Sequence, residues 1–435
     1  MPTVAPLAWY GALFGLFLAI ALILKKFNPV YSLFLGATVG AIVGGADLPQ
    51  VVAMLTTGTQ SVMGTVIRVL AAGILAGAMM ESGAAETIAE AIVDKLGEGK
   101  AIIALALATM IITSVGVFIP VAVLIVAPIA LSVGNKMGIS KIGLLLALSG
   151  GGKAGNIISP NPNAIAAANG FHVSLSDVML AGYSAAIVGL IVTIVIASMI
   201  KHKGIQVTDE EVAQLGAREV KKDLPPLSKA IIAPAVAIIL LMINPIGAML
   251  HMPALAKIKL DAMYVLPFAG VLGLLAMGQK HKILAYSSIG LERMTATILI
   301  LIGAGAIAGL IAASNLSAQV VHLIEVAGIS GTFLAPISGV LMAAATASTS
   351  TGVILATGTF GAAISHVGIP SISAAVMVHT GATVIDALPQ GNYFHVTANS
   401  MNMSIKQRMS LLPYEAMVGG AMTILATILY GFILK

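Results

Sequence analysis

Long apolar runs separated by short polar stretches fill most of this 435-residue chain. Several of these runs approach the roughly 20 residues that a helix needs to cross the hydrocarbon core of a bilayer. The pattern therefore predicts an all-α polytopic membrane protein. Uninterrupted spans are expected at 7–24, 31–44, 66–80, 180–200, 230–250, 262–277, 295–311 and 414–434.

Two further apolar segments, 101–133 and 332–364, are each interrupted halfway by small polar residues, at 113–116 and 346–352. Each arm then has about 12 to 14 residues, or about 18–21 Å of helix, against a bilayer core of about 30 Å. Non-helical backbone at that depth is stable only where it is buried in protein or lines a watery cavity. We therefore expect two re-entrant helical hairpins with polar tips near the midplane. The alternative is one long span with a polar middle in each case.

Composition supports the membrane assignment. Of all residues, 58% are hydrophobic and 9% are charged, whereas soluble domains have about 25% charged residues. The net charge of +5 is not gathered into a basic face, so nucleic acid is not expected as a partner. The absence of cysteine excludes disulfides and cysteine-ligated metal. Because no basic residue precedes span 7–24, we expect this span to be retained and not cleaved as a signal peptide.

The placement of basic residues predicts an orientation. Most of the 22 Lys and Arg residues fall on one side when the N-terminus is placed outside. Cytoplasmic loops carry an excess of these residues, so we expect a protein of the cell (cytoplasmic) membrane with a cytoplasmic linker at 201–229. This orientation holds only if segments 101–133 and 332–364 each enter and leave on one side, as hairpins do.

Two stretches about 230 residues apart are similar. Residues 72–77 read AGILAG and residues 304–309 read AGAIAG, and a Pro-x-x-Asn pattern recurs at Pro160 and Pro389. The charge pattern orients the two halves oppositely, which is typical of secondary transporters built from inverted repeats. The expected organisation is an N-terminal repeat at 1–200, a cytoplasmic linker at 201–229 and an inverted C-terminal repeat at 230–435.

A span that follows each hairpin is predicted to be a broken helix, at 141–165 and at 371–396. Between 149 and 164 the first contains four glycines, two prolines and three asparagines, which do not sustain a continuous helix. The half-helix that begins near Asn163 would direct its positive dipole end at the break, which suits a carboxylate. A phosphate-binding loop is excluded, because no Ser or Thr follows Lys153 and no strand precedes the glycines.

The polar groups of the two tips and two breaks are the expected ligands of a small hydroxylated anion, whose charge Lys153 would offset. The predicted substrate-binding residues are Ser114, Gly116, Lys153, Ser159, Asn161, Asn163, Ser348, Thr349, Ser350 and Thr383.

Asp386 is the main candidate for proton coupling, because an ionisable residue at membrane depth is costly and therefore functional by default. The alternatives are that Asp386 caps the half-helix after Pro389 or that it pairs with Lys153. His379 is the second candidate for the proton, its alternative being a hydrogen-bonded packing role. His395 is expected to be structural, near the inner interface. One Asp and two His at these spacings do not make a zinc site, so no metal is expected.

Four motifs resemble the gluconate permease (GntP) family of the ion-transporter superfamily, with this chain as a divergent member. They are the run TSVGVFIP at 113–120, the SPNPN break at 159–163, the Ala/Thr/Ser-rich hairpin before Gly352-Val353, and Thr383-x-x-Asp386. The resemblance covers most of the chain in order and spacing. It implies a proton-coupled importer of gluconate or related sugar acids or, in some members, of a D-amino acid such as D-serine. It also implies a scaffold domain, an elevator-like transport domain that carries both hairpins, and a homodimer.

The chain departs from the family pattern in the regions that contact substrate. The sequence SPNP at 159–162 stands where the family has Pro-Pro-His-Pro, and LPQ at 388–390 stands where a Phe-Trp pair is expected. The acidic residue common in the family's first hairpin is absent near Val115. Asp386 does match. These departures concern the identity of the substrate more than transport itself.

The expected function is secondary active transport by proton-coupled symport, with uptake of a small hydroxy-carboxylate or sugar acid such as gluconate. The alternatives are a sodium-coupled symporter of an organic anion or D-amino acid, since unwound carbonyls are good Na⁺ ligands, and a cation/proton antiporter. No enzyme is expected, because the sequence has no metal constellation, Ser–His pairing or nucleotide motif. A channel is disfavoured, because inverted halves suit alternating access. No cofactor is expected beyond the coupling ion, H⁺ or Na⁺; the expected partners are a small organic anion, the lipid bilayer and a second copy of the chain.

Overall fold

The computed structural model describes residues 6–25, 27–216, 224–258, 260–316, 318–319, 322, 326, 330–389 and 391–434. Over these ranges the chain is helical, and the only β pairing consists of isolated bridges. Six of the helices described are long and apolar enough to cross a membrane. The prediction of an all-α polytopic protein is therefore confirmed.

The N-terminal half contributes α1 (Trp9–Leu24), α2 (Pro29–Val43), α3 (Leu48–Ser61), α4 (Met63–Glu81), α5 (Ala84–Leu96), α6 (Ala101–Ser114), α7 (Ile119–Met137), α8 (Lys141–Ile157), α9 (Pro162–Gly170) and α10 (Leu175–Ile200). The linker contains α11 (Asp209–Gly216) and α12 (Leu227–Ala230). The C-terminal half contributes α13 (Ile232–Met249), α14 (Pro253–Ala256), α15 (Ala262–Ala276), α16 (Ile283–Ala312), α18 (Leu334–Thr346), α19 (Thr349–His366), α20 (Ser371–Gly381), α21 (Asn392–Ser400), α22 (Ile405–Met409) and α23 (Leu412–Ile428). Single turns of other helix types lie at Glu98–Lys100, Lys280–Lys282, Gly331–Phe333 and Leu429–Ile433.

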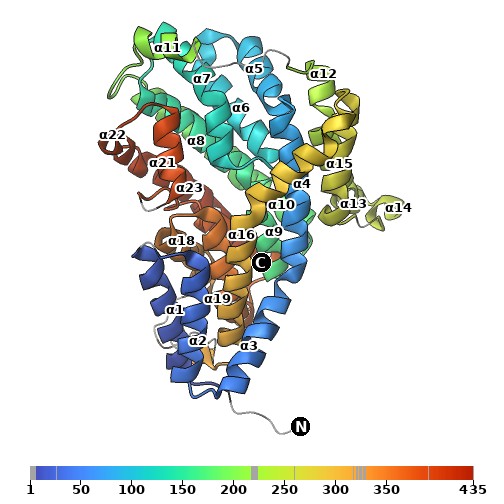
Figure 1. Ribbon diagram of the computed structural model, residues 1–435, viewed down its shortest axis with the longest axis vertical. Coiled ribbons are helices and arrows are strands. Elements are labelled where there is room, and N and C mark those ends of the chain that lie inside the picture. Colours follow the sequence, from blue (N-terminus) through green and yellow to red (C-terminus); the bar gives the residue numbers. More distant parts are fainter. Residues whose placement is uncertain are drawn as a thin grey trace.

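The long helix α16 packs along α4, α3 and α2 and links the two ends of the molecule. Figure 1 shows α1, α2 and α3 at the end where the N-terminus lies, and α5, α6 and α7 at the opposite end. A Cβ on Gly58 of α3 would lie 2.2 Å from the carbonyl oxygen of Gly305 in α16. The absence of side chains at this contact lets the two helices approach closely, as in many membrane helix pairs.

The first interrupted segment folds as two helices joined by a short turn. α6 ends at Ser114 and α7 begins at Ile119, and the two helices pack against each other. In the turn, Gly116 has a φ of 104°, a conformation that only glycine adopts without strain. The 14 residues of α6 extend for about 21 Å. This arm is therefore too short to cross a bilayer core, as predicted. The prediction of 12 to 14 residues is wrong for the other arm, because α7 has 19 residues and is long and apolar enough to cross a membrane.

The second interrupted segment has the same form. α18 and α19 pack against each other and are joined by Ala347, which has a φ of 48°, and by Ser348. The Ser348 hydroxyl accepts a hydrogen bond from the Thr351 backbone N–H at 3.3 Å and so caps α19. Entry of the two hairpins from opposite membrane faces, and the inverted repeat, stay predictions.

The first broken span differs from the prediction at its glycine run. α8 continues to Ile157, so residues 150–152 are helical, and the unwound stretch is only 158–161. A Cβ on Gly151 would lie 2.1 Å from the carbonyl oxygen of Ala106 in α6. Gly151 therefore packs closely on α6, as Gly150 does on α10 and Gly152 on α7. The break lies instead at the prolines, which lack the N–H that a helix needs.

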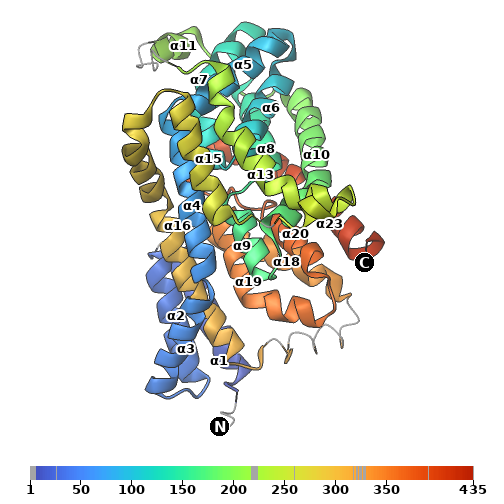
Figure 2. The ribbon, with the colours of Figure 1, turned by 90° about the vertical axis from the view of Figure 1, so that its right-hand side faces the viewer.

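The second broken span is interrupted between α20 and α21, over residues 382–391. This stretch contains Asp386 and Pro389, while Gln390 lies outside the described residues. Figure 2 shows both unwound stretches in the middle of the molecule, between the groups of helices at its two ends.

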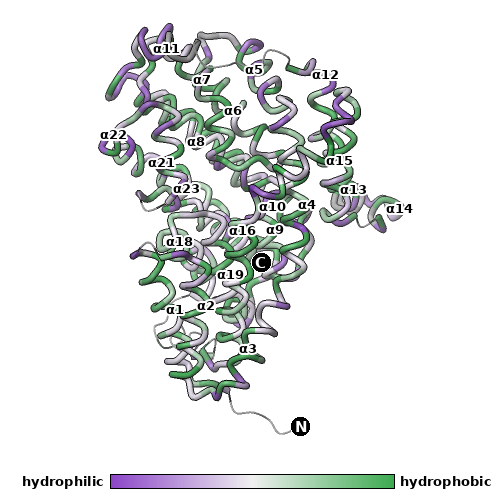
Figure 3. The backbone as a smooth tube through the Cα atoms, in the orientation of Figure 1, coloured by the Kyte–Doolittle hydropathy of each residue, from purple (hydrophilic) through white to green (hydrophobic). Residues whose placement is uncertain are grey.

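The linker docks on the end formed by α7 and α8. Asn135 of α7 donates to the Asp209 carboxylate at 3.0 Å, and Lys141 of α8 forms an ion pair with Glu211. Residues 217–223 lie outside the described part of the chain. Hydrophilic residues gather around α11 and α22, as Figure 3 shows, which fits contact of this end with water.

Candidate functional site

Each hairpin tip lies against one of the two breaks. A Cβ on Gly116 would lie 4.0 Å from the carbonyl oxygen of Pro160 in the first break. In the second half the contact is closer, because a Cβ on Gly391 would lie 2.3 Å from the carbonyl oxygen of Ala347. The fold thus brings four non-helical stretches together, as the sequence predicts for a midplane site.

A cavity of about 720 Å³, here called the central cavity, opens between these stretches and α16. Its apolar lining comprises Ile23, Phe27, Met80, Phe118, Ile119, Val121, Met294, Ile300 and Ile354. Its polar and charged lining comprises Asn156, Asn163, Arg293, Thr297, Thr346, Ser348, Thr349, Ser350, Thr351, Asp386, Asn392, Tyr393 and His395.

In the described part of the chain five helices begin at the central cavity: α2, which Asn28 caps, and α7, α9, α19 and α21. The first backbone N–H groups of a helix have no partner within it, and the helix dipole makes this end positive. Asn161 caps α9 and Ser348 caps α19. By contrast, no side chain among the described residues caps α7 or α21. The start of α21 therefore offers its first backbone N–H groups to an anion in the cavity, whereas α7 offers the Ile119 N–H, because Pro120 has none and the Val121 N–H donates to the Phe118 carbonyl oxygen.

A buried ion pair joins the two halves of the chain at the cavity wall. The Lys153 ammonium of α8 donates to Asp386 Oδ1 at 2.6 Å and to the Thr383 carbonyl oxygen at 2.5 Å. The other carboxylate oxygen of Asp386 accepts from the Thr349 hydroxyl at 2.6 Å. The Lys153 side chain is fully buried, whereas Asp386 reaches the cavity. The pairing that the sequence left as an alternative for Asp386 is thus present.

Asparagines tie the first break to the second hairpin. The Ser350 hydroxyl of α19 donates to the side-chain oxygen of Asn163 in α9. The Asn161 amide group donates to the Asn156 carbonyl oxygen at 2.8 Å, and its own oxygen accepts from the Asn163 backbone N–H at 2.8 Å. The side-chain nitrogen of Asn156 is buried and has no hydrogen-bond partner among the described residues.

Of the predicted substrate-binding residues, Asn163, Ser348, Thr349 and Ser350 line the central cavity, as does Asp386, the proton-coupling candidate. The remaining ones fall outside its lining, and their positions are as follows. Lys153 and Thr383 lie behind Asp386. In the first break, Asn161 caps α9 and Ser159 is buried. At the tip of the first hairpin, Gly116 forms the turn and the Ser114 hydroxyl donates to the Ile111 carbonyl oxygen at 2.8 Å.

His379 lies inside α20 and is fully buried. Neither of its ring nitrogens has a hydrogen-bond partner in the described part of the chain, and it does not line the central cavity. His395 lines the cavity, and its ring nitrogen lies 2.7 Å from the Pro389 carbonyl oxygen. No group of three His, Asp or Glu among the described residues could hold a metal ion.

Sequence reasoning missed a second buried ion pair beside the cavity. Arg408 of α22 donates to both carboxylate oxygens of Glu415 in α23, at 2.7 and 3.0 Å. The Tyr393 hydroxyl, which reaches the cavity from α21, donates to the same carboxylate at 3.1 Å. The guanidinium also stacks over the rings of Tyr393 and Phe394. The available signal was Glu415, an acid at the start of an apolar span.

Comparison with known proteins gives the following similarities. The model of a family described as GntP family permease matches residues 7–433. An uncharacterized transporter of Haemophilus influenzae is 47% identical over 421 residues, which cover 97% of each chain. The inner membrane permease YgbN of Escherichia coli is 27% identical over 320 residues, 68% of this chain and 70% of that protein. The YdaH transporter of Alcanivorax borkumensis, whose crystal structure has an unusual topology, is similar in fold, with a TM-score of 0.62 and 15% identity over 89% of this chain and 90% of that one.

Proposed function

The chain belongs to the GntP permease family and is a multi-pass membrane transporter; on this premise we propose that it takes up a small hydroxy-carboxylate, such as gluconate or a related sugar acid, by proton-coupled symport. The proposal adds the substrate class and the coupling ion to what family membership gives.

The observation that carries the proposal is the pair of uncapped helix ends, α7 and α21, at the central cavity. A carboxylate placed there would accept hydrogen bonds from the Ile119 N–H of α7 and from the first backbone N–H groups of α21. Hydroxyl groups on the same solute would meet the side chains of Ser348, Ser350 and Asn163. This donor set suits an acid that carries several hydroxyls.

The Lys153–Asp386 pair supports coupling to a proton. While Asp386 is ionised, its charge is balanced by Lys153 at 2.6 Å. A proton on Asp386 would neutralise the carboxylate and leave a buried cation without its partner, which is unfavourable. An incoming organic anion would then restore the balance. In this scheme proton and anion stabilise each other in the site, which is the requirement for symport.

We further propose that the two halves are inverted repeats and that a transport domain carrying both hairpins moves as an elevator against a scaffold domain in a homodimer. The similar order of elements supports the repeat, since each half has a helix–turn–helix followed by an interrupted helix.

Sodium coupling is the nearest alternative. The oxygens best suited to Na⁺ are the carbonyl of Thr383 and the carboxylate of Asp386, because hard cations prefer oxygen ligands. Both already bind the Lys153 ammonium. This observation favours the proton over Na⁺ as the coupling ion. For the same reason it counts against a cation/proton antiporter.

The test is uptake of labelled gluconate, glycerate, lactate, hydroxybutyrate and D-serine into proteoliposomes, driven by an inward proton gradient without sodium. We expect at least one of the acids to accumulate, with empty liposomes and a proton uncoupler as controls. Accumulation that requires a sodium gradient would reject proton coupling. Proton-for-cation exchange without uptake of any solute would reject symport.

A further inference from the structure

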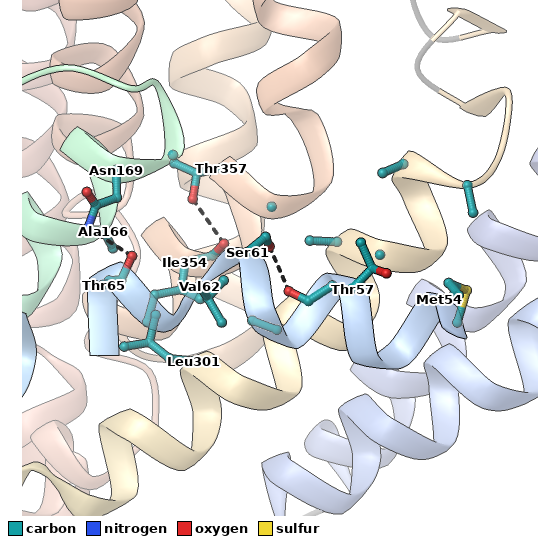
Figure 4. Close-up of a pocket in the computed structure, with 18 of the residues that line it drawn as sticks. Met54, Thr57, Ser61, Val62, Thr65, Ala166, Asn169, Leu301, Ile354 and Thr357 are labelled. Carbon is teal, nitrogen blue, oxygen red and sulfur yellow. Dashed lines mark hydrogen bonds between the residues drawn. The ribbon is translucent and has the colours of Figure 1, made fainter. Parts of the chain in front are cut away.

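A second cavity, of about 790 Å³, lies beside the central cavity. It is enclosed by α3, α4 and α16 on one side and by α9 and α19 on the other. Figure 4 shows its lining, with Thr57, Ser61 and Thr65 along α3 and α4 and with Asn169 and Thr357 facing them. None of the sequence-predicted site residues lines it.

Ile354 of α19 lines both cavities. The same helices continue from one cavity to the other: Asn163 of α9 lines the central cavity and Ala166, one turn on, lines the second. On α16, Ile300 lines the central cavity and its neighbour Leu301 lines the second cavity. One helical turn rises about 5.4 Å. The two cavities are thus separated by a layer about one side chain thick, and Ile354, which is 4% exposed, is at its centre.

The cavities reach toward opposite ends of the same helices. The second cavity includes Leu7, just before α1 begins, and Gln50, at the start of α3. The central cavity includes Phe27, just after α1 ends, and Met80, in the last turn of α4. If α1 and α4 cross the membrane, the two cavities face its two sides.

The chemistry of the two cavities differs. Among the described residues no Asp, Glu, Lys or Arg lines the second cavity. Its polar groups are the imidazole of His172 and hydroxyls and amides such as those of Ser61 and Asn169. The nearby Arg68 donates to the Asn169 side-chain oxygen at 3.2 Å but is held by Asp261 at 2.5 Å. This lining suits a hydroxylated solute in passage. It lacks the buried charges of the central cavity.

We propose that the second cavity is the other half of the solute path and that the Ile354 layer is the barrier that closes this path from the central cavity. The barrier is built from packed side chains without any ion pair, so its permeability depends on the volume of residue 354. The inference rests on the proposed function only for the nature of the solute.

The absence of native cysteine allows a direct accessibility test on the full-length protein. Ser61→Cys reports on the second cavity and Thr297→Cys on the central one. Each variant is treated on ice, without substrate, with a small membrane-impermeant methanethiosulfonate added to right-side-out or to inside-out vesicles. We expect the two cysteines to be modified from opposite sides, each at least tenfold faster than from the other side.

The barrier is tested by adding Ile354→Ala to Thr297→Cys. We expect modification from the side of the second cavity to become at least tenfold faster. The control is Ile364→Ala, which removes the same atoms from a buried position of α19 outside both cavities. Ile354→Leu, which keeps the side-chain volume, is expected to leave the rate unchanged and shows whether the position tolerates substitution.

Two results would overturn the inference: Ser61→Cys reacts from neither side or from the same side as Thr297→Cys, or Ile354→Ala behaves like Ile364→Ala. The labelling needs no substrate, so its outcome is separate from that of the uptake assay. Opposite-sided labelling without uptake of any tested acid would reject the proposed substrate class and leave the path intact.

Discussion

Lys153 and Asp386 are 0% and 2% exposed, and their charged atoms are 2.6 Å apart. A buried charge that loses its partner is strongly destabilising, whereas a neutral polar replacement can keep part of the hydrogen bonding. Substitutions of Lys153 and of Asp386 are therefore expected to have different consequences. Replacing the carboxylate by an amide preserves its shape and removes only its charge and its proton.

We predict that Asp386→Asn keeps substrate binding but abolishes proton-driven accumulation, because the amide cannot exchange a proton. Binding is measured by the thermal shift with the transported acid, and accumulation by uptake under a proton gradient. Asp177→Asn, in the first turn of α10 and away from the central cavity, is the control. Lost binding with proton-driven transport still present would give Asp386 a substrate role instead.

The second buried pair allows a cleaner test of stability. Arg408→Met leaves Glu415 buried without its cation, a change that costs about 3–5 kcal/mol in other proteins. We expect a large fall in the melting temperature of the purified protein, followed by circular dichroism. The double variant Arg408→Met with Glu415→Leu has no unpaired charge and should recover most of the loss. A double variant no more stable than the single one would contradict this account.

The half-buried Arg68–Asp261 pair predicts a dependence of stability on pH. Burial raises the pKa of Asp261, but hydrogen bonds from Arg68 and the Met263 backbone and the charge of Arg68 outweigh burial and hold the pKa below its usual 3.8. The pair therefore stabilises the fold fully above about pH 3.8. That contribution is lost as the pH falls through the lowered pKa.

The measurement is the difference in melting temperature between the natural protein and Asp261→Asn. We expect this difference to be constant above about pH 4 and to shrink as the pH is lowered further. A difference that grows on acidification would contradict the sign of the pKa shift.

At the scale of elements, the helices and their interruptions follow from local sequence, but the exact position of one break does not. The apolar runs and polar tips predicted both helix–turn–helix units. The glycines at 150–152 were read as helix breakers, and α8 runs through them because they pack on the neighbouring helices α10, α6 and α7. Glycine has either role, and only the position of the neighbouring helix decides which. Proline has two roles as well: Pro160 marks the break, whereas Pro128 and Pro267 lie inside α7 and α15.

We predict that Gly151→Ala destabilises the protein, because the new methyl group would lie 2.1 Å from the Ala106 carbonyl oxygen and force α6 and α8 apart. Overpacking of this kind typically costs about 1–3 kcal/mol. Gly420→Ala is the matched control, since nothing lies within 4 Å of a Cβ there. As Ala favours a helix over Gly by about 1 kcal/mol, the control should be neutral or slightly stabilising in a melting experiment.

At the scale of the whole molecule, the sequence predicted the class of fold and which stretches carry the chemistry, because hydropathy and breaker residues act locally. Five of the predicted site residues line one cavity. The features that were missed depend on contacts across the fold. Ile354 is an ordinary apolar residue in the sequence, and its place between two cavities follows only from the positions of α9, α16 and α19.

The ion pair between the two halves also sets an order of events in biosynthesis. Lys153 and Asp386 are separated by 233 residues. At a translation rate of about 5–20 residues per second, the lysine leaves the ribosome on the order of 10–50 seconds before the aspartate. During that interval the first half cannot close around Lys153 without burying a lone cation. The nascent N-terminal half must therefore keep this amine hydrated until the last quarter of the chain has been inserted beside it.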